Sequence, residues 1–492
     1  MDFFNYPLTA FDSASPRGYP AFLLFFRSTN PQTGLQALED GVAKLIQRLP
    51  FLAGDIHPCP CDHPFKEQIQ PSPRTLDKVP MFQSQYQPVP MSSVVSQLGS
   101  AIYTNTLCPI RPRLDDSEPH PVLRFQGTQL KDGIVLSMSF SHNVFDAAGA
   151  GYVLESLAAC CYNTSTGGTD AQMPLALDPE ADLRIRQVIL DDVSRPYSTG
   201  QFSENYRCNA SEKVPDELAS VVAVYHHKMY TLSENKIQIL RTTCNNLTPC
   251  FEKVSSSQAR SLSRSDIVSA ALALCVKRSR AAAAQSGLVS KPKEPGRFAL
   301  AVNLRPRLRK VGAEKYFGSF MTTVQINSIQ KDVYPGGGFS DYKGFDLLHL
   351  TRLALNFRQK VTAVTPEYVH ELGSHLRQQK NIRLTTRPAE FGVTDMRPLK
   401  MYSLNFGGQL GFIDYLWLQL KPIDGTCVIM PARIKDSDNH YGSKVEGSWD
   451  VLITLKPNVL DTLEKDPLFS FLVEKKEQLI GFNSNTGVHA HL

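Results

Sequence analysis

The first part of the chain joins a short apolar run to a segment of helical periodicity. Residues 19–26 are mostly apolar and end at Arg27, which is typical of a buried strand. Residues 35–49 then carry apolar side chains at helical spacing, and Pro50 ends the predicted helix. The chain therefore begins with a strand and a helix, and residues 51–55 are predicted to turn into another strand.

The clearest strand in the pattern covers residues 134–142. Its apolar side chains share one face with His142, and three serines share the other face. A turn of small residues follows, and residues 151–161 are predicted to form a helix. From about residue 163 to residue 215 the periodicity fades, and we interpret this stretch as a long connection between two halves.

The second half also alternates strands and helices. Its predicted strands are 225–232, 298–303, 320–326, 430–432 and 450–455, and its predicted helices begin after Ser233, near Ser263 and Asp266 (267–280), and at 346 (346–361). This alternation predicts an α/β fold in two halves of similar size. We place the domains at 1–200 and 219–492, with a crossover linker at 201–218.

Composition narrows the class of protein. Of the 492 residues, 42% are hydrophobic and 20% are charged, which excludes a largely disordered chain. The net charge of +5 is mild and no run of Lys and Arg occurs, so we expect no nucleic-acid partner, although an anionic small molecule is compatible. Ten cysteines are scattered along the chain, and no apolar run is long enough to span a bilayer. We expect a cytoplasmic monomer with reduced thiols and no membrane span.

The most informative motif is His142-Asn143-Val144-Phe145-Asp146. A histidine at the carboxyl end of a strand lies where α/β sheets usually bind ligands, and apolar neighbours favour its neutral form, which a general base needs. Asp146 has two possible roles: to orient the histidine, or to cap the next helix and bind a cation. A buried core histidine followed by an ordinary capping aspartate is the alternative to a catalytic pair.

Other candidate chemistry has weaker support. The stretch from His57 to His63 has His, Cys, Cys and His at every second position, but it lacks the two-pair spacing of zinc sites, so we expect no metal. Neither a G-x-G-x-x-G motif nor a phosphate-binding loop occurs, so nicotinamide and ATP chemistry have no support.

A series of segments along the chain resembles the landmarks of the BAHD acyltransferases, in the same order. The resemblance is to the fungal enzymes that acylate secondary metabolites, in the trichothecene acetyltransferase-like branch. The segments are 8–12 (LTAFD), 49–54 (LPFLAG), 142–146 (HNVFD), 263–266 (SRSD), 302–307 (VNLRPR), 316–319 (YFGS) and 405–409 (NFGGQ). They span nearly the whole chain.

This resemblance implies a fold and a reaction. The fold would be two chloramphenicol acetyltransferase-like domains, each a mixed sheet with flanking helices, with an active-site tunnel between them. A segment around 405–425 would return to the first sheet. The enzyme would move an acyl group, by default acetyl, from acyl-CoA to a hydroxyl of a bulky terpenoid, polyketide or alkaloid. His142 would act as general base without an acyl-enzyme intermediate.

The resemblance also assigns the remaining site residues. Asp146 would pair with Arg305 and fix the loop that presents His142. Thr394, carried over by position, would stabilise the oxyanion. Separately from the resemblance, Ser263, Arg264 and Ser265 begin a predicted helix, so its N–H groups and a cation could meet a CoA phosphate, although plain helix capping is the preferred interpretation.

Several departures from the family pattern leave alternatives open. Gly149 stands two residues later than the glycine of H-x-x-x-D-G, and Met396 stands where many plant members have tryptophan. The segment 405–409 keeps only Phe406 and Gly407 of the family's D-F-G-W-G. A condensation-type domain, whose first motif histidine is replaced here by Ser141, and a non-catalytic ligand-binding relative are the two alternatives.

Overall fold

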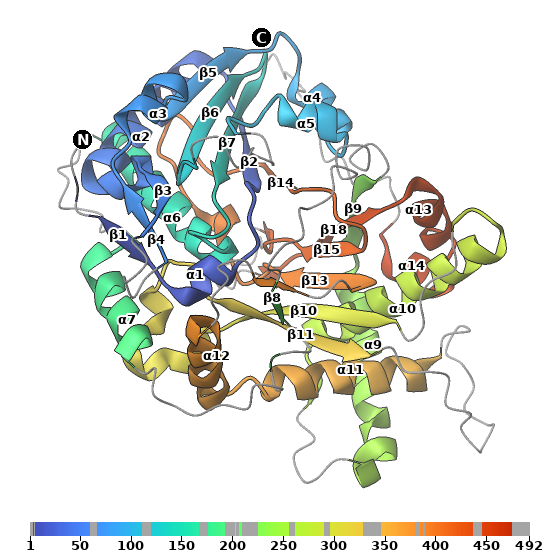
Figure 1. Ribbon diagram of the computed structural model, residues 1–492. Coiled ribbons are helices and arrows are strands. Elements are labelled where there is room, and N and C mark those ends of the chain that lie inside the picture. Colours follow the sequence, from blue (N-terminus) through green and yellow to red (C-terminus); the bar gives the residue numbers. More distant parts are fainter. Residues whose placement is uncertain are drawn as a thin grey trace, which may run out of the picture.

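Two mixed β-sheets with flanking helices form the protein (Figure 1). The computed structural model describes residues 3, 5–59, 66–110, 120–166, 176–191, 202, 206–208, 225–254, 261–289, 296–327, 346–378, 384–386, 389–435 and 445–474. Statements about the structure below concern these residues.

The first sheet has five strands. In spatial order they are β14 (Tyr415–Gln419), β2 (Ala21–Arg27), β7 (Gly133–Phe140), β6 (Leu123–Gln129) and β5 (Phe82–Tyr86). Neighbouring strands are antiparallel except for β5 and β6. Every residue of β7 is buried, which shows that both faces of the sheet are covered.

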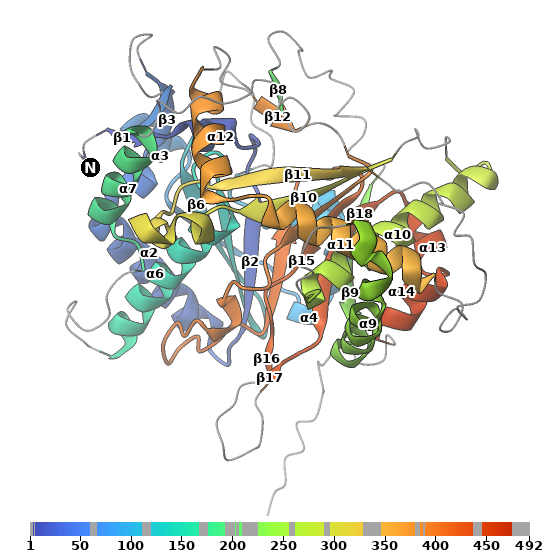
Figure 2. The same cartoon turned by 90° about the horizontal axis from the view of Figure 1, so that it is seen from below.

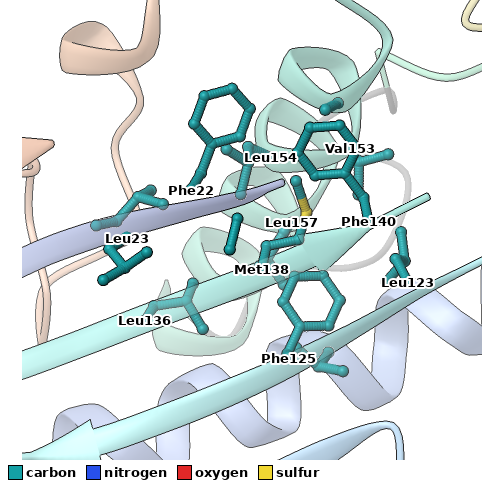
Figure 3. Close-up of a cluster of buried hydrophobic side chains, with 14 of the residues drawn as sticks. Phe22, Leu23, Leu123, Phe125, Leu136, Met138, Phe140, Val153, Leu154 and Leu157 are labelled. Atoms are coloured by element: carbon teal, nitrogen blue, oxygen red, sulfur yellow. The ribbon is translucent and has the colours of Figure 1, made fainter. Parts of the chain in front are cut away.

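Helices α2 (Pro31–Arg48) and α6 (Ala147–Thr166) pack against each other and against one face of the first sheet. The side chains at this contact are apolar and alternate along the strands, as the pattern predicted. Figure 3 shows them meeting: Phe22, Phe125, Met138 and Phe140 from the strands, and Val153, Leu154 and Leu157 from α6.

The second sheet has six strands. In spatial order they are β11 (Met321–Asn327), β10 (Arg297–Asn303), β13 (Phe391–Asp395), β15 (Thr426–Ile429), β18 (Trp449–Leu455) and β9 (His226–Leu232). The strand β13 is parallel to both of its neighbours, and the other pairs are antiparallel. Its helices are α9 (Glu234–Leu247), α10 (Arg264–Gln285), α11 (Leu347–Thr362), α13 (Pro457–Leu463) and α14 (Pro467–Leu472), which lie together on one side of the molecule in Figure 2.

Alternate residues of the second sheet belong to two different cores. Cys427 and Ile453 lie in the core formed with α10, whereas Val428 and its register partner Leu452 lie in the core of the first sheet. We call the face that carries Val428 and Leu452 the inner face. It packs toward the first half of the chain.

The remaining elements are short strands and helices, together with the longer helices α7 and α12. They are β1 (Tyr6–Leu8), β3 (Asp55–Pro58), β4 (Glu67–Gln70), β8 (Tyr206–Cys208), β12 (Leu384–Thr386), β16 (Ile434–Lys435), β17 (Val445–Glu446), α1 (Ala10–Ala14), α3 (Pro73–Lys78), α4 (Met91–Gln97), α5 (Ala101–Asn105), α7 (Pro179–Asp191), α12 (Pro366–Gln378), η1 (Pro50–Ala53), η2 (Thr248–Val254), η3 (Arg305–Val311), η4 (Ala313–Lys315) and η5 (Met401–Ser403). The strands β1, β4 and β3 form a separate small sheet.

One strand of the first sheet comes from late in the chain. The strand β14 lies within the segment 405–425 and pairs antiparallel with β2, so the second half contributes directly to the first sheet. The predicted linker at 201–218 falls largely outside the described residues, which include Phe202 and β8 from that range. The domain boundaries stay a prediction.

Two expectations about secondary structure are wrong. Residues 430–432 follow β15 without forming a strand, and Pro431 at their centre has no N–H group to donate to a neighbouring strand. The stretch 163–215 is not a plain connection, because α6 continues to Thr166 and α7 lies within the stretch. The buried face of α7 carries Ala181 and Ile185 at helical spacing, but charged residues between them hid this period.

Candidate active site

His142 lies two residues after the end of β7, on the loop that leads to α6. Its backbone N–H donates to the carbonyl oxygen of Gly18 at 3.0 Å, and the N–H of Ser141 donates to that of Val122 at 2.9 Å. The side chain of His142 is partly exposed, while Ser141 and Asn143 are buried. The loop is therefore held on both sides while the imidazole stays accessible.

The environment of His142 favours the neutral imidazole. Burial lowers its pKa from 6.5, against the opposing effects of its own backbone and the negative charge of Asp146. Its Nδ1 is buried and has no hydrogen-bond partner among the described residues. A partly exposed imidazole whose neutral form is favoured is what proton abstraction requires.

Asp146 makes its contacts away from His142. Its Oδ1 accepts the N–H of Gly149 in the first turn of α6 at 2.9 Å, and its Oδ2 accepts the N–H of Phe320 at 2.9 Å. Both oxygens also bind Arg305, at 3.0 Å from Nη2 to Oδ1 and 2.7 Å from Nη1 to Oδ2. Asp146 was expected either to orient His142 or to cap the next helix and bind a cation. Its contacts are those of the second role.

The pair between Asp146 and Arg305 is buried, with residue exposures of 5% and 3%. Burial alone raises the pKa of the Asp146 carboxyl, but the Arg305 charge and the hydrogen bonds outweigh this effect and hold the pKa below its usual value. The predicted ion pair is thus present, and it is bidentate.

Arg305 also holds the backbone of the segment 316–320. Its Nε donates to the carbonyl oxygen of Tyr316 and its Nη2 to that of Gly318, both at 2.6 Å. The guanidinium therefore connects the loop before α6 to a segment that precedes β11.

Gly149, which stands two residues later than the glycine of the family motif, lies against the backbone of Phe317. A Cβ atom at this position would lie 2.0 Å from the carbonyl oxygen of Phe317, so a side chain cannot be accommodated without moving the backbone. The rings of Phe145 and Phe317 pack nearby, with centroids 6.0 Å apart. The loop that carries His142 is therefore in close contact with the segment 316–320.

Thr394 lies on the inner face of the second sheet. It is the register partner of Val428 in a parallel strand pair, so both side chains point to the same face. Thr394 is partly exposed. Met396, one residue beyond β13, is 8% exposed and belongs to the core that contains Val144 and Phe145. Both residues thus face the half of the protein that carries His142.

Ser263, Arg264 and Ser265 each have a partner within the protein. Ser263 and Asp266 form a capping box at the start of α10. Arg264 is paired with Glu234, and the hydroxyl of Ser265 donates to Asp395 at 2.7 Å. The capping interpretation describes Ser263, and the CoA-binding role of the three residues stays a prediction.

Two hollows in the protein surface lie away from His142. One is lined by Phe11, Ile189, Leu308, Val369, His370, Gly373, Ser374 and Arg377, and the other by Arg241, Thr242, Asn245, Asn246, Thr248 and Ser261. The expected tunnel stays a prediction. In the described part of the chain, no three His, Cys, Asp or Glu side chains gather as a metal site would require. Cys61 and His63 lie outside that part.

Sequence reasoning missed a buried charged cluster beside the segment 316–320. It contains Asp12, which the sequence analysis quoted without a role, and Asp182 and Arg186 of α7, which it did not consider. The helical period of α7 was the available signal, and recognising it would have placed both charged residues on a buried face.

Comparison with known proteins identifies the family. The model of the Transferase family matches residues 92–469, and that of the trichothecene 3-O-acetyltransferase-like N-terminal domain matches residues 22–161. The chain belongs to the Transferase family, that of the BAHD acyltransferases. The predicted family is confirmed, and the protein is an acyl-CoA-dependent acyltransferase.

Curated relatives match over nearly their whole length. Fumigaclavine B O-acetyltransferase easN of Aspergillus fumigatus is 28% identical over 505 residues, covering 96% of this chain and 98% of the relative. Communesin N16 acyltransferase cnsK of Penicillium expansum is 28% identical over 488 residues, covering 96% of this chain and 99% of the relative.

Solved structures confirm the predicted fold. TRI101 of F. graminearum, complexed with coenzyme A and deoxynivalenol, matches with a TM-score of 0.69 at 16% identity, covering 96% of this chain and 99% of that one. Vinorine synthase matches with a TM-score of 0.62 at 16% identity, covering 96% of this chain and 94% of that one. The BAHD acyltransferase therefore has the two-sheet α/β fold of these enzymes.

Proposed function

We propose that this acyltransferase transfers an acetyl group from acetyl-CoA to a hydroxyl of a bulky, largely apolar secondary metabolite, with His142 as general base. The observation that carries this proposal is an accessible histidine, kept neutral by burial, on a loop that a buried ion pair holds in place. A favoured neutral form and a fixed position are the two properties that a general base needs, and both support this proposal.

The reaction needs no covalent enzyme intermediate. His142 accepts the proton of the acceptor hydroxyl while the hydroxyl oxygen forms a bond to the carbonyl carbon of the thioester. The carbonyl electrons move to the oxygen and form a tetrahedral oxyanion. When the oxyanion collapses, the C–S bond breaks, and the CoA thiolate leaves and recovers the proton from the imidazolium. The products are the ester and free CoA.

The oxyanion needs a hydrogen-bond donor that is already in place. We propose the hydroxyl of Thr394, which lies on the inner face and is partly exposed. Met396 lies two residues further along the same segment and is proposed to contact the acceptor. Methionine adapts to irregular apolar shapes, which suits a bulky terpenoid, polyketide or alkaloid better than a flat phenylpropanoid.

The choice of donor and acceptor is supported by the relatives. The matched TRI101 structure contains coenzyme A and deoxynivalenol, and several relatives are O-acetyltransferases. One relative is described as an N16 acyltransferase, so the test below includes amines. For CoA we keep Ser263, Arg264 and Ser265 as candidates, and binding there requires Arg264 to exchange its contact with Glu234.

The proposal also includes the oligomeric state of the protein and its location in the cell. We propose that the protein is a monomer, which analytical ultracentrifugation tests. A cytoplasmic location suits a large chain with scattered cysteines, and is tested by a fluorescent fusion. No helix of the described part of the chain combines the length and apolar character needed to cross a bilayer.

The decisive experiment incubates the purified protein with a panel of acyl-CoAs and candidate alcohols and amines. Thiol release and mass spectrometry report turnover and product. His142→Ala is expected to lower kcat by about 10²–10⁴-fold while the protein stays folded. His349→Ala is the matched control, because His349 lies on α11 in the second half and is also partly buried. Turnover by His142→Ala at the rate of the control variant would refute the proposed role.

The same experiment separates the alternatives. A non-catalytic relative would bind acyl-CoA and release no thiol with any acceptor. A condensation-type domain would form amides from carrier-bound substrates and leave free alcohols unreacted.

A further inference from the structure

The segment 316–320 is held by three buried carboxylates from three separate parts of the chain. Each accepts one backbone N–H of the segment: Phe317 donates to Asp182 Oδ1 (2.9 Å), Ser319 to Asp12 Oδ1 (2.7 Å) and Phe320 to Asp146 Oδ2 (2.9 Å). Asp12 lies in α1, Asp182 in α7 and Asp146 immediately before α6. The carbonyl oxygens of the same segment bind Arg305, so its backbone is fixed by charged groups on both sides.

Arg186 joins two of these carboxylates. Its Nη1 donates to Asp12 Oδ2 at 2.7 Å, and its Nε donates to Asp182 Oδ2 at 2.5 Å. Exposure of these three residues is 0–1%. Arg186 places its positive charge between two buried carboxylates that would otherwise repel each other.

Aromatic residues complete the cluster. The hydroxyl of Tyr6 donates to Asp182 Oδ2 at 2.6 Å, and that of Tyr316 donates to Asp12 Oδ2 at 2.9 Å. The guanidinium carbon of Arg186 lies 5.0 Å from the ring centre of Tyr6, 4.8 Å from that of Tyr316 and 5.6 Å from that of Phe317. We call Asp12, Asp182 and Arg186 with these two tyrosines the buried cluster.

The buried cluster reaches His142 through the segment 316–320. The carbonyl oxygen of Phe317 leaves no room for a side chain on Gly149, and the Phe317 ring packs on Phe145. A shift of the segment would therefore displace the loop 142–149, because both contacts are close and the interior is tightly packed.

We propose that Asp182, Arg186 and Asp12 are positioning residues for His142, acting through the segment 316–320. This proposal rests on the proposed function, in which His142 is the base. The ion pair between Asp146 and Arg305 holds one side of the segment, and the buried cluster holds the other. The reaction rate depends on the position of His142, because displacing a catalytic group by about 1 Å can lower the rate by up to about 10²-fold.

The test uses Asp182→Asn in the full-length protein. One amide oxygen cannot replace two carboxylate oxygens, so the variant loses either the N–H of Phe317 or the contact with Arg186. We expect kcat to fall about tenfold or more, with the KM for acyl-CoA changed less than about twofold. As His142 loosens and gains water, its pKa rises toward 6.5, and the acid limb of kcat/KM moves to higher pH.

Asp466→Asn is the matched control. Asp466 is also buried, caps α14 and binds an arginine, Arg278, with both oxygens, but it lies among the helices of the second sheet. Its replacement is expected to lower Tm without changing kcat or the pH profile. This separates loss of stability from loss of positioning.

Tyr316→Phe serves if Asp182→Asn does not fold. It removes one hydroxyl from the buried cluster and leaves all its charges, and the same changes in kcat and pH profile are expected at smaller size. Wild-type kcat and an unchanged acid limb in the folded variants, with a lowered Tm, would overturn the proposal. If these variants behave like wild type while His142→Ala is inactive, only the positioning role is refuted and His142 remains the base. If His142→Ala is fully active, the proposed role of His142 as base is refuted.

Discussion

Removal of either partner of the pair between Asp146 and Arg305 is the sharpest perturbation that the structure offers. Asp146→Asn places an amide group against the Arg305 guanidinium. Arg305→Ala leaves a buried carboxylate without its cation and removes the guanidinium donor from two carbonyl oxygens. Because both residues are almost completely buried, water cannot replace the lost partner.

The expected loss is large. Breaking a buried ion pair by removing one partner costs about 3–5 kcal/mol of unfolding free energy. In a large domain this lowers Tm by roughly 6–20 °C, at about 2–4 °C per kcal/mol. The double variant is expected to lose about 1–3 kcal/mol less than the sum of the single losses, because the second change leaves no further charge unpaired.

The assay is urea unfolding followed by circular dichroism, combined with steady-state kinetics at a temperature where each variant is folded. The Arg278–Asp466 pair is the control: its loss lowers stability by less, since the Arg278 side chain is 41% exposed and screened by water, and leaves kcat unchanged. If the loss of unfolding free energy in the double variant equals the sum of the two single losses, Asp146 and Arg305 are not coupled and the pairing is refuted. An Asp146→Asn enzyme that is inactive but fully stable would show that Asp146 orients His142 directly.

Three further predictions concern the site. The acid limb of kcat/KM is expected below pH 6.5, because burial lowers the pKa of His142; an acid limb at or above pH 6.5 would contradict this. Thr394→Ala is expected to lower kcat and Met396→Trp to raise the KM for the acceptor, with acyl-CoA binding unchanged; equal effects on both substrates would refute the assignment. Gly149→Ala is expected to cost about 1–3 kcal/mol and lower kcat, because its Cβ meets a carbonyl oxygen at 2.0 Å; a stable, fully active variant would show that the loop adapts.

Periodicity predicted most of the elements that build the two sheets. The strands β2 and β10 and the helices α2 and α11 lie within a few residues of their expected positions, because each has one apolar face of regular period. Periodicity failed where polar residues are buried. Asp182 and Arg186 of α7 interrupt its apolar face, yet both are buried because they neutralise each other.

The candidate site could be predicted only as far as local motifs reach. His142, Asp146 and Arg305 were expected from short patterns, and the pairing of the last two is present. The contacts of Asp12 and Asp182 with the segment 316–320 join residues more than a hundred positions apart. Local sequence carries no signal for such contacts, since any buried carboxylate can accept any unpaired N–H.

The eroded segment 405–409 was the one argument for a non-catalytic protein, and the structure weakens it. Phe406 is 1% exposed and its ring packs edge-to-face on Phe26 with centroids 5.0 Å apart. Gly407 has a φ of 93°, which favours glycine, and its N–H is accepted by the side-chain oxygen of Asn405 at 3.0 Å. Asparagine accepts this hydrogen bond as an aspartate would. The two residues that match the family pattern are therefore those that the turn needs, and the departures around them are compatible with an intact fold and an active His142.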